Sequence, residues 1–174
     1  MKKIGLFYWA KGGNVEHCAK KIAKQLTGFE TEIYSLDAIG ELDLPYYDLV
    51  IVGGAAVGAD TWEKASGNNL WFEFFNRLTN AHLDGKPVAI FGLGDQVLYP
   101  DHFVDGMKVI KKEFDRVGAR LIGSWPTDGY DHTGSESIVN GKFIGLALDE
   151  DQQPELTDQR IEKWVKQIIQ ESGL

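Results

Sequence analysis

Hydrophobic residues in this chain follow two alternating patterns. In the first, short apolar or β-rich segments are bounded by polar or glycine-containing stretches, as at Leu49-Val50-Ile51-Val52. A continuous apolar run of this kind is typical of a strand that is buried on both faces of a sheet. The expected strands are residues 4–8, 32–36, 49–52, 87–91 and 120–123.

In the second pattern, apolar residues recur three or four positions apart, which places them on one face of a helix. The stretch after the first strand shows this spacing at Val15, Cys18, Ala19, Ile22, Ala23 and Leu26. Further helices are expected over residues 69–78, over 103–117 and around 161–169. Five strands that alternate with helices predict an α/β fold with a parallel sheet.

One segment breaks this alternation. Residues 124–141 are rich in Gly, Asp and Ser, and the apolar run 143–148 after them is interpreted as the fifth strand resuming. The sequence therefore predicts an interrupted fifth strand. A length of 174 residues fits a single domain over residues 1–174, and no internal repeat, low-complexity tract or linker divides it.

Composition narrows the class of protein. The chain has 18 Lys and Arg against 26 Asp and Glu, a net charge of −8. This charge argues against a nucleic-acid ligand and favours a basic partner, unless it serves only solubility. Cys18 is the single cysteine, so no internal disulfide can form, as expected in a reducing cytoplasm. No apolar run approaches the roughly 20 residues that span a bilayer, and no export signal is recognised. We therefore expect a cytoplasmic protein with no membrane partner.

Three glycine-containing loops follow predicted strands, at residues 9–14, 54–62 and 92–101. Ligands of open α/β sheets bind outside the carboxyl ends of the strands, so these loops are expected to converge on a ligand. The first loop precedes a helix start, where unpaired backbone N–H groups form a ready anion site. The alternative is a plain turn in which Gly12 and Gly13 serve only the backbone geometry.

Longer motifs add a family resemblance. They are Phe91-Gly92-Leu93-Gly94-Asp95-Gln96 with Tyr99, Trp125-Pro126-Thr127-Asp128-Gly129-Tyr130, and Gly141-Lys142-Phe143-Ile144-Gly145-Leu146-Ala147-Leu148-Asp149-Glu150-Asp151. On these motifs the chain resembles the long-chain flavodoxins over nearly its whole length. The resemblance implies a flavodoxin-like three-layer sandwich around a five-stranded parallel sheet in the order 2-1-3-4-5, bound FMN and one-electron transfer.

The resemblance also implies which residues bind the cofactor. They are Trp9, Ala10, Lys11, Gly12, Gly13, Asn14 and Val15 in the first loop, Ala56, Val57, Gly58 and Ala59 in the second, and Leu93, Gly94, Asp95, Tyr99 and His102 in the third.

The first of these loops is atypical for the family. Its members place Thr or Ser, whose hydroxyls hold the phosphate, at the positions of Ala10, Gly12 and Val15. The remaining backbone N–H groups, the charge of Lys11 and the amide of Asn14 are expected to compensate for the missing hydroxyls.

The second and third loops carry the ring contacts that the resemblance implies. Val57 replaces an aromatic residue that commonly covers one face of the flavin. Trp62 and Trp9 are candidate replacements, unless each serves only local packing. The Gly58 carbonyl is expected to flip toward N5-H of the reduced flavin, since glycine lowers the cost of a flip; otherwise Gly58 is an ordinary turn glycine. Tyr99 is expected to stack on the other face, unless it is merely a surface aromatic residue between the loop and the helix.

Several loop carboxylates are expected to surround the ligand, lower the flavin potential and steer a basic partner, unless they form only a solvated face. They are Asp60, Glu63, Asp95, Asp101, Asp128, Asp131, Asp149, Glu150 and Asp151.

The leading hypothesis is a low-potential FMN-binding electron carrier, a monomer acting between a reductase and acceptor redox proteins with basic docking surfaces. One alternative is a flavodoxin-fold binding or regulatory module that has lost FMN or binds a different ligand. Another is a flavin-dependent quinone or azo reductase. The four histidines lack metal-ligand spacing and no nucleophile–base pair is recognised, so neither a metal site nor an enzyme is expected.

Overall fold

The computed structural model describes residues 1–57 and 70–174, and its centre is a parallel sheet. The strands follow the order β2-β1-β3-β4-β5, and every neighbouring pair is parallel. Their bounds are β1 Lys3–Trp9, β2 Glu30–Ser35, β3 Leu49–Gly54, β4 Pro87–Leu93 and β5 Arg120–Ile122. The predicted fold class and strand order are therefore confirmed.

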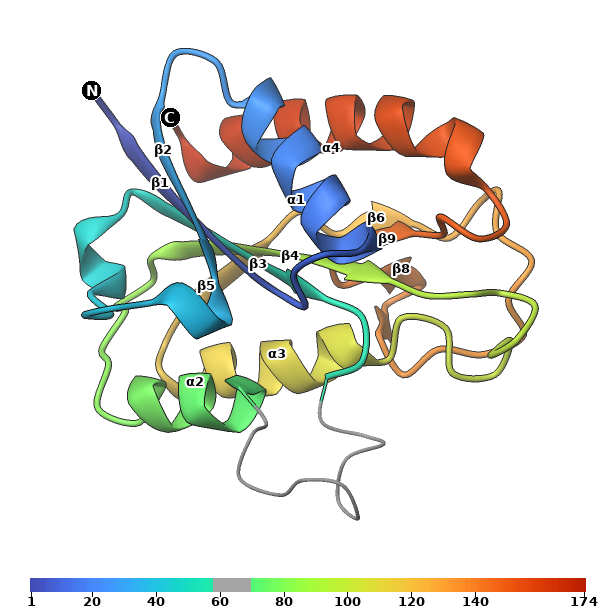
Figure 1. The fold of residues 1–174 in the computed structure, drawn as a ribbon, viewed down its shortest axis with the longest axis horizontal. Helices are drawn as coiled ribbons and strands as arrows, with labels where there is room; N and C mark the ends of the chain where they lie inside the picture. The colour runs from blue at the N-terminus through green and yellow to red at the C-terminus, as the bar shows by residue number, and fades with distance from the viewer. Residues whose placement is uncertain (58–69) are drawn as a thin grey trace.

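Helices cover both faces of this sheet (Figure 1). On one face lie α1 (Asn14–Gln25) and α4 (Thr157–Ser172), and on the other lie α2 (Leu70–Leu78) and α3 (Gly106–Arg116). Each pair of helices closes its own hydrophobic core against the sheet. The chain is completed by the short 3-10 helices η1 (Leu36–Ala38), η2 (Leu44–Tyr46) and η3 (Pro154–Leu156). Among the described residues, no helix is long and apolar enough to cross a membrane.

The fifth strand is interrupted, as the sequence predicts. β5 pairs with the first half of β4, and β9 (Leu146–Leu148) pairs with the second half. Between them, β6 (Trp125–Pro126), β7 (Ile138–Val139) and β8 (Lys142–Phe143) form a small antiparallel sheet in the order β6-β8-β7.

Several predicted boundaries differ from the structure by one or a few residues, and two of these differences bear on the fold. The run 143–148 is not one strand, because Phe143 pairs within the small sheet while Leu146 begins β9. The chain changes sheets at Gly145, which lies so close to the backbone of Ile90 that a Cβ there would be 2.0 Å from its carbonyl oxygen. Phe103 is fully buried but precedes α3, which begins only at Gly106.

Candidate functional site

The loops after β1, β3 and β4 start side by side at one edge of the sheet. Trp9 pairs with Gly54, and Gly54 pairs with Gly92, so the three strands reach this edge in one row. The convergence expected from the sequence is therefore present for the described parts of these loops. Gly58, Ala59 and Trp62 lie outside the described residues, as do the carboxylates Asp60 and Glu63.

The first loop presents backbone rather than side chains. Residues 10–14 are exposed, whereas Val15 is buried among the core residues of α1. Gly13 is the N-cap of α1 and makes no side-chain capping hydrogen bond. Gly12 has φ of +83°, which favours glycine, and no atom would lie within 4 Å of a Cβ at Gly12 or Gly13. Open space therefore adjoins the start of the helix.

Lys11, the expected phosphate partner, is already engaged. Its Nζ forms an ion pair with the carboxylate of Asp37 in η1, and the Lys11 side chain is 56% exposed. The hydrogen bond and charge of this pair raise the pKa of Lys11 and lower the pKa of Asp37. Both groups are therefore charged at neutral pH.

Trp9 and Val57, which are expected near the flavin ring, differ in how deeply their side chains are buried. Trp9 is half-buried and packs against the core beneath α2 and α3. Val57 is 1% exposed, and its side chain lies close to Gly54 and Gly106. The structure therefore gives Val57 a packing position, whereas its neighbour Ala56 is exposed.

The third loop holds a row of exposed apolar side chains. Val97, Leu98 and Tyr99 are 66%, 70% and 61% exposed. The Oδ1 atom of Asp95 accepts the N–H groups of Val97 and Leu98 at 2.9 and 3.0 Å, and these bonds hold the loop in place. The same bonds lower the pKa of the Asp95 carboxyl. Tyr99 thus stands on a loop of fixed shape, as a stacking platform requires.

The flanking predicted residues frame this loop. Leu93 ends β4 and is buried, and Gly94 follows it against the ring of Phe103, where a Cβ would be 2.8 Å from a ring carbon. His102 is exposed, and its Nδ1 lies 2.9 Å from Oδ2 of Asp105.

A buried polar network behind the loop escaped the sequence analysis. The fully buried Asp149 carboxylate accepts two N–H groups from Gln96, at 3.0 and 2.9 Å, and the backbone N–H groups of Asp151 and Gln152. Asp149 and Asp95, two of the nine loop carboxylates of which several were expected around the ligand, are buried acceptors in the structure. The sequence does contain one signal for this structural role: Asp149 comes directly after the fully buried strand β9, so its carboxylate begins in the protein interior.

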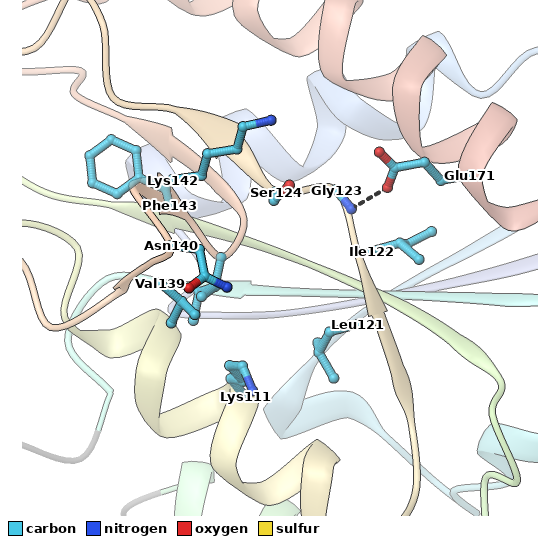
Figure 2. Close-up of a pocket in the computed structure, with 11 residues that line it drawn as sticks. Lys111, Leu121, Ile122, Gly123, Ser124, Val139, Asn140, Lys142, Phe143 and Glu171 are labelled. Atoms are coloured by element: carbon cyan, nitrogen blue, oxygen red, sulfur yellow. Dashed lines mark hydrogen bonds between the residues drawn. The ribbon is translucent and has the colours of Figure 1, made fainter.

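A cavity of about 300 Å³ lies elsewhere, beyond the end of β5. Figure 2 shows it between β5, β8 and the helices α3 and α4, with the carboxylate of Glu171 accepting the Gly123 N–H at 2.7 Å. None of the predicted cofactor residues lines it. No group of three or more potential metal ligands gathers among residues 1–57 and 70–174. The converging loops therefore remain the candidate site.

Cys18 belongs to the core and not to this site. It is fully buried, and burial raises the pKa of its thiol to about 12. Such a thiol stays protonated and unreactive.

Comparisons with known proteins agree on one family. The Flavodoxin family model matches residues 6–164. The chain is 40% identical to a flavodoxin of Trichodesmium erythraeum over the full length of both, and 39% identical to flavodoxin 1 of Escherichia coli over all of this chain and 97% of that one. A crystal structure of Fusobacterium nucleatum flavodoxin bound to flavin mononucleotide superposes with a TM-score of 0.86 at 29% identity, covering 98% of this chain and 99% of that one. These matches confirm the resemblance drawn from the sequence motifs, and the chain belongs to the flavodoxin family.

Proposed function

We propose that this chain binds FMN at the three converging loops and carries single electrons between redox proteins. The observation that carries this proposal is the full-length match to flavodoxins together with the row formed by Trp9, Gly54 and Gly92. A related flavodoxin of similar structure is bound to FMN. FMN supplies the one-electron chemistry when bound, and the chain supplies binding and orientation.

The first loop fits the phosphate end of such a cofactor. The Gly12 N–H already donates to an anionic oxygen, that of Glu16, so the loop is built to hold an anion. The helix dipole of α1 points its positive end at the same place. Open space beside Gly12 and Gly13 leaves room for a phosphate to approach the backbone.

The third loop fits the ring end. The apolar side chains of this loop do not pack into the hydrophobic core and are exposed; they are Val97, Leu98 and Tyr99. An aromatic ring prefers to stack on a flat apolar partner, and stacking also shields the flavin from water. Tyr99 is therefore the proposed platform for one face of the ring.

Partner recognition is proposed to depend on charge. The net charge of −8 favours partners with basic docking surfaces, and such complementarity mainly raises the rate of association. We further propose that the protein acts as a monomer in the cytoplasm, where its single, buried Cys18 stays reduced.

A visible spectrum tests the proposed function. Protein mixed with excess FMN and then desalted should keep the bands of oxidised flavin at about one flavin per chain. Chemically reduced holoprotein should pass electrons to a haem protein, and should not oxidise NAD(P)H with a quinone unless a separate reductase is added. A protein that neither retains FMN nor quenches its fluorescence would instead be a binding module on this fold. NAD(P)H oxidation without a reductase would identify an enzyme.

Replacing Lys11 should affect the binding of the FMN phosphate and not the binding of the flavin ring. Lys11→Ala removes a charge beside the loop, so the dissociation constant of FMN should rise while that of riboflavin, which lacks the phosphate, stays unchanged. The pair with Asp37 and the exposure of Lys11 limit the effect to roughly fivefold in affinity. Titrations that follow quenching of flavin fluorescence measure both constants.

Lys24→Ala is the matched control for this prediction. Lys24 is an exposed lysine in the last turn of α1, so its loss changes the net charge equally but far from the loop. Equal weakening of FMN and riboflavin by Lys11→Ala would show that Lys11 does not contact the phosphate.

A further inference from the structure

Glu16 turns its carboxylate back onto the first loop. It lies in the first turn of α1, and its Oε2 accepts the N–H of Gly12 at 2.5 Å. Its Oε1 lies 2.7 Å from Nζ of Lys20, one turn further along the helix. The Glu16 side chain is only 22% exposed. The carboxylate is therefore held by the Gly12 N–H on one oxygen and by the Lys20 ammonium on the other.

We propose that the Glu16 carboxylate competes with the phosphate of FMN for the Gly12 N–H, and so lowers the preference of this chain for FMN over riboflavin. This inference rests on the proposed function. Both anions seek the same donor, because an N–H at a helix start is the group that binds phosphate in sites of this type. For the phosphate to reach it, the Glu16 side chain must rotate away and leave its partners.

The charges around Glu16 strengthen this competition. A phosphate monoester carries a charge of about −1.5 to −2 at neutral pH, so it is repelled by a neighbouring carboxylate. The ammonium groups of Lys20 and Lys11 are not free to offset this repulsion. Lys20 is paired with Glu16 itself, and Lys11 is paired with Asp37. The Lys20 ammonium and the Gly12 N–H lower the pKa of Glu16, so the carboxylate stays ionised throughout the neutral range.

The composition of the first loop increases the importance of the Gly12 N–H as a donor to the phosphate. Residues 10–15 are Ala, Lys, Gly, Gly, Asn and Val, and none of these side chains has a hydroxyl. Backbone N–H groups must therefore supply most of the hydrogen bonds to a phosphate. A carboxylate that takes one of them removes a large share of the available donors.

Glu16→Gln tests the proposal directly. The variant keeps the size of the side chain and removes its charge. It therefore removes the repulsion of the phosphate and weakens the competing bond to the Gly12 N–H, so FMN should bind about tenfold more tightly. Riboflavin affinity should change less than about twofold, because riboflavin has no phosphate to compete for the donor. Quenching titrations of wild type and variant with each flavin give the four dissociation constants.

Glu162→Gln is the matched control. Glu162 forms the same kind of pair, with Lys166 four residues on at 2.6 Å, but on α4 and away from the loop. The Glu162→Gln variant should bind FMN and riboflavin with the affinities of the wild type. Unchanged or weaker FMN binding by Glu16→Gln, or an equal change for riboflavin, would overturn the proposal.

A second readout is independent of flavin binding. Inorganic phosphate should shift the NMR signal of the Gly12 amide at lower concentration in Glu16→Gln than in the wild type. Should neither flavin bind, the proposed cofactor is wrong, and this titration still decides the competition. Identical phosphate titrations of the two proteins would overturn it.

Discussion

Replacing Gly145 by alanine should lower the free energy of unfolding by about 3 kcal/mol or more. The new Cβ would lie 2.0 Å from the carbonyl oxygen of Ile90 and 2.8 Å from its carbonyl carbon. Both atoms belong to the backbone of β4, in the middle of the sheet, so no side-chain rotation relieves the clash. Urea unfolding followed by circular dichroism measures the loss.

Gly40→Ala provides the comparison. A Cβ at Gly40 would meet no atom within 4 Å, and its φ is not in the left-handed region. Its effect should stay within about 0.5 kcal/mol. If Gly145→Ala were equally mild, the close approach of β9 to β4 at this point would be wrong.

Asp149→Asn should lower the free energy of unfolding by about 2–4 kcal/mol. The wild-type carboxylate accepts four N–H groups in a fully buried position. An amide keeps one acceptor oxygen and turns an NH₂ group toward donors, so buried N–H groups lose their partners. The loop that carries Tyr99 is tied to Asp149 through Gln96, so riboflavin and FMN should both bind more weakly.

Asp151→Asn separates this effect from a simple loss of charge. Asp151 is exposed and lies two residues away, so its replacement should change neither unfolding nor flavin affinity appreciably. Chemical denaturation and flavin titration of the two variants, side by side, measure the difference. Equal stability of Asp149→Asn and wild type would mean that the network does not support the loop.

Much of the fold follows from the sequence because burial leaves a clear pattern. Leu49-Val50-Ile51-Val52 is apolar throughout because β3 lies in the centre of the sheet, and every residue of that strand is buried. The same rule fails at residues 143–148. This run is also buried throughout, yet it divides between two sheets. Hydrophobicity reports burial and not the identity of the neighbouring strand, so the division at Gly145 could not be predicted.

The site shows the same limit. The convergence of the loops follows from the parallel order of the strands. The pairs that Lys11 forms with Asp37 and Glu16 forms with Gly12 depend on where η1 and the first turn of α1 lie, which no local pattern specifies. Asp149 was misplaced on the surface because carboxylates are usually exposed, and only its N–H partners reveal why this one is buried.

The register of the divided fifth strand identifies the intervening segment as an inserted module that does not set the pairing of β4. Ala89 pairs with Ile122 and Phe91 with Leu146, which leaves Ile90 opposite Gly145. A chain with Ile122 joined directly to Gly145 would thus present one continuous strand to β4 without any slip. Residues 123–144 can therefore vary in length and shape while the sheet keeps its pairing. The third loop has no such independence, since Gln96 accepts an N–H from Asp131 within that module. Changes near Asp131 would therefore reach the proposed flavin site through Gln96.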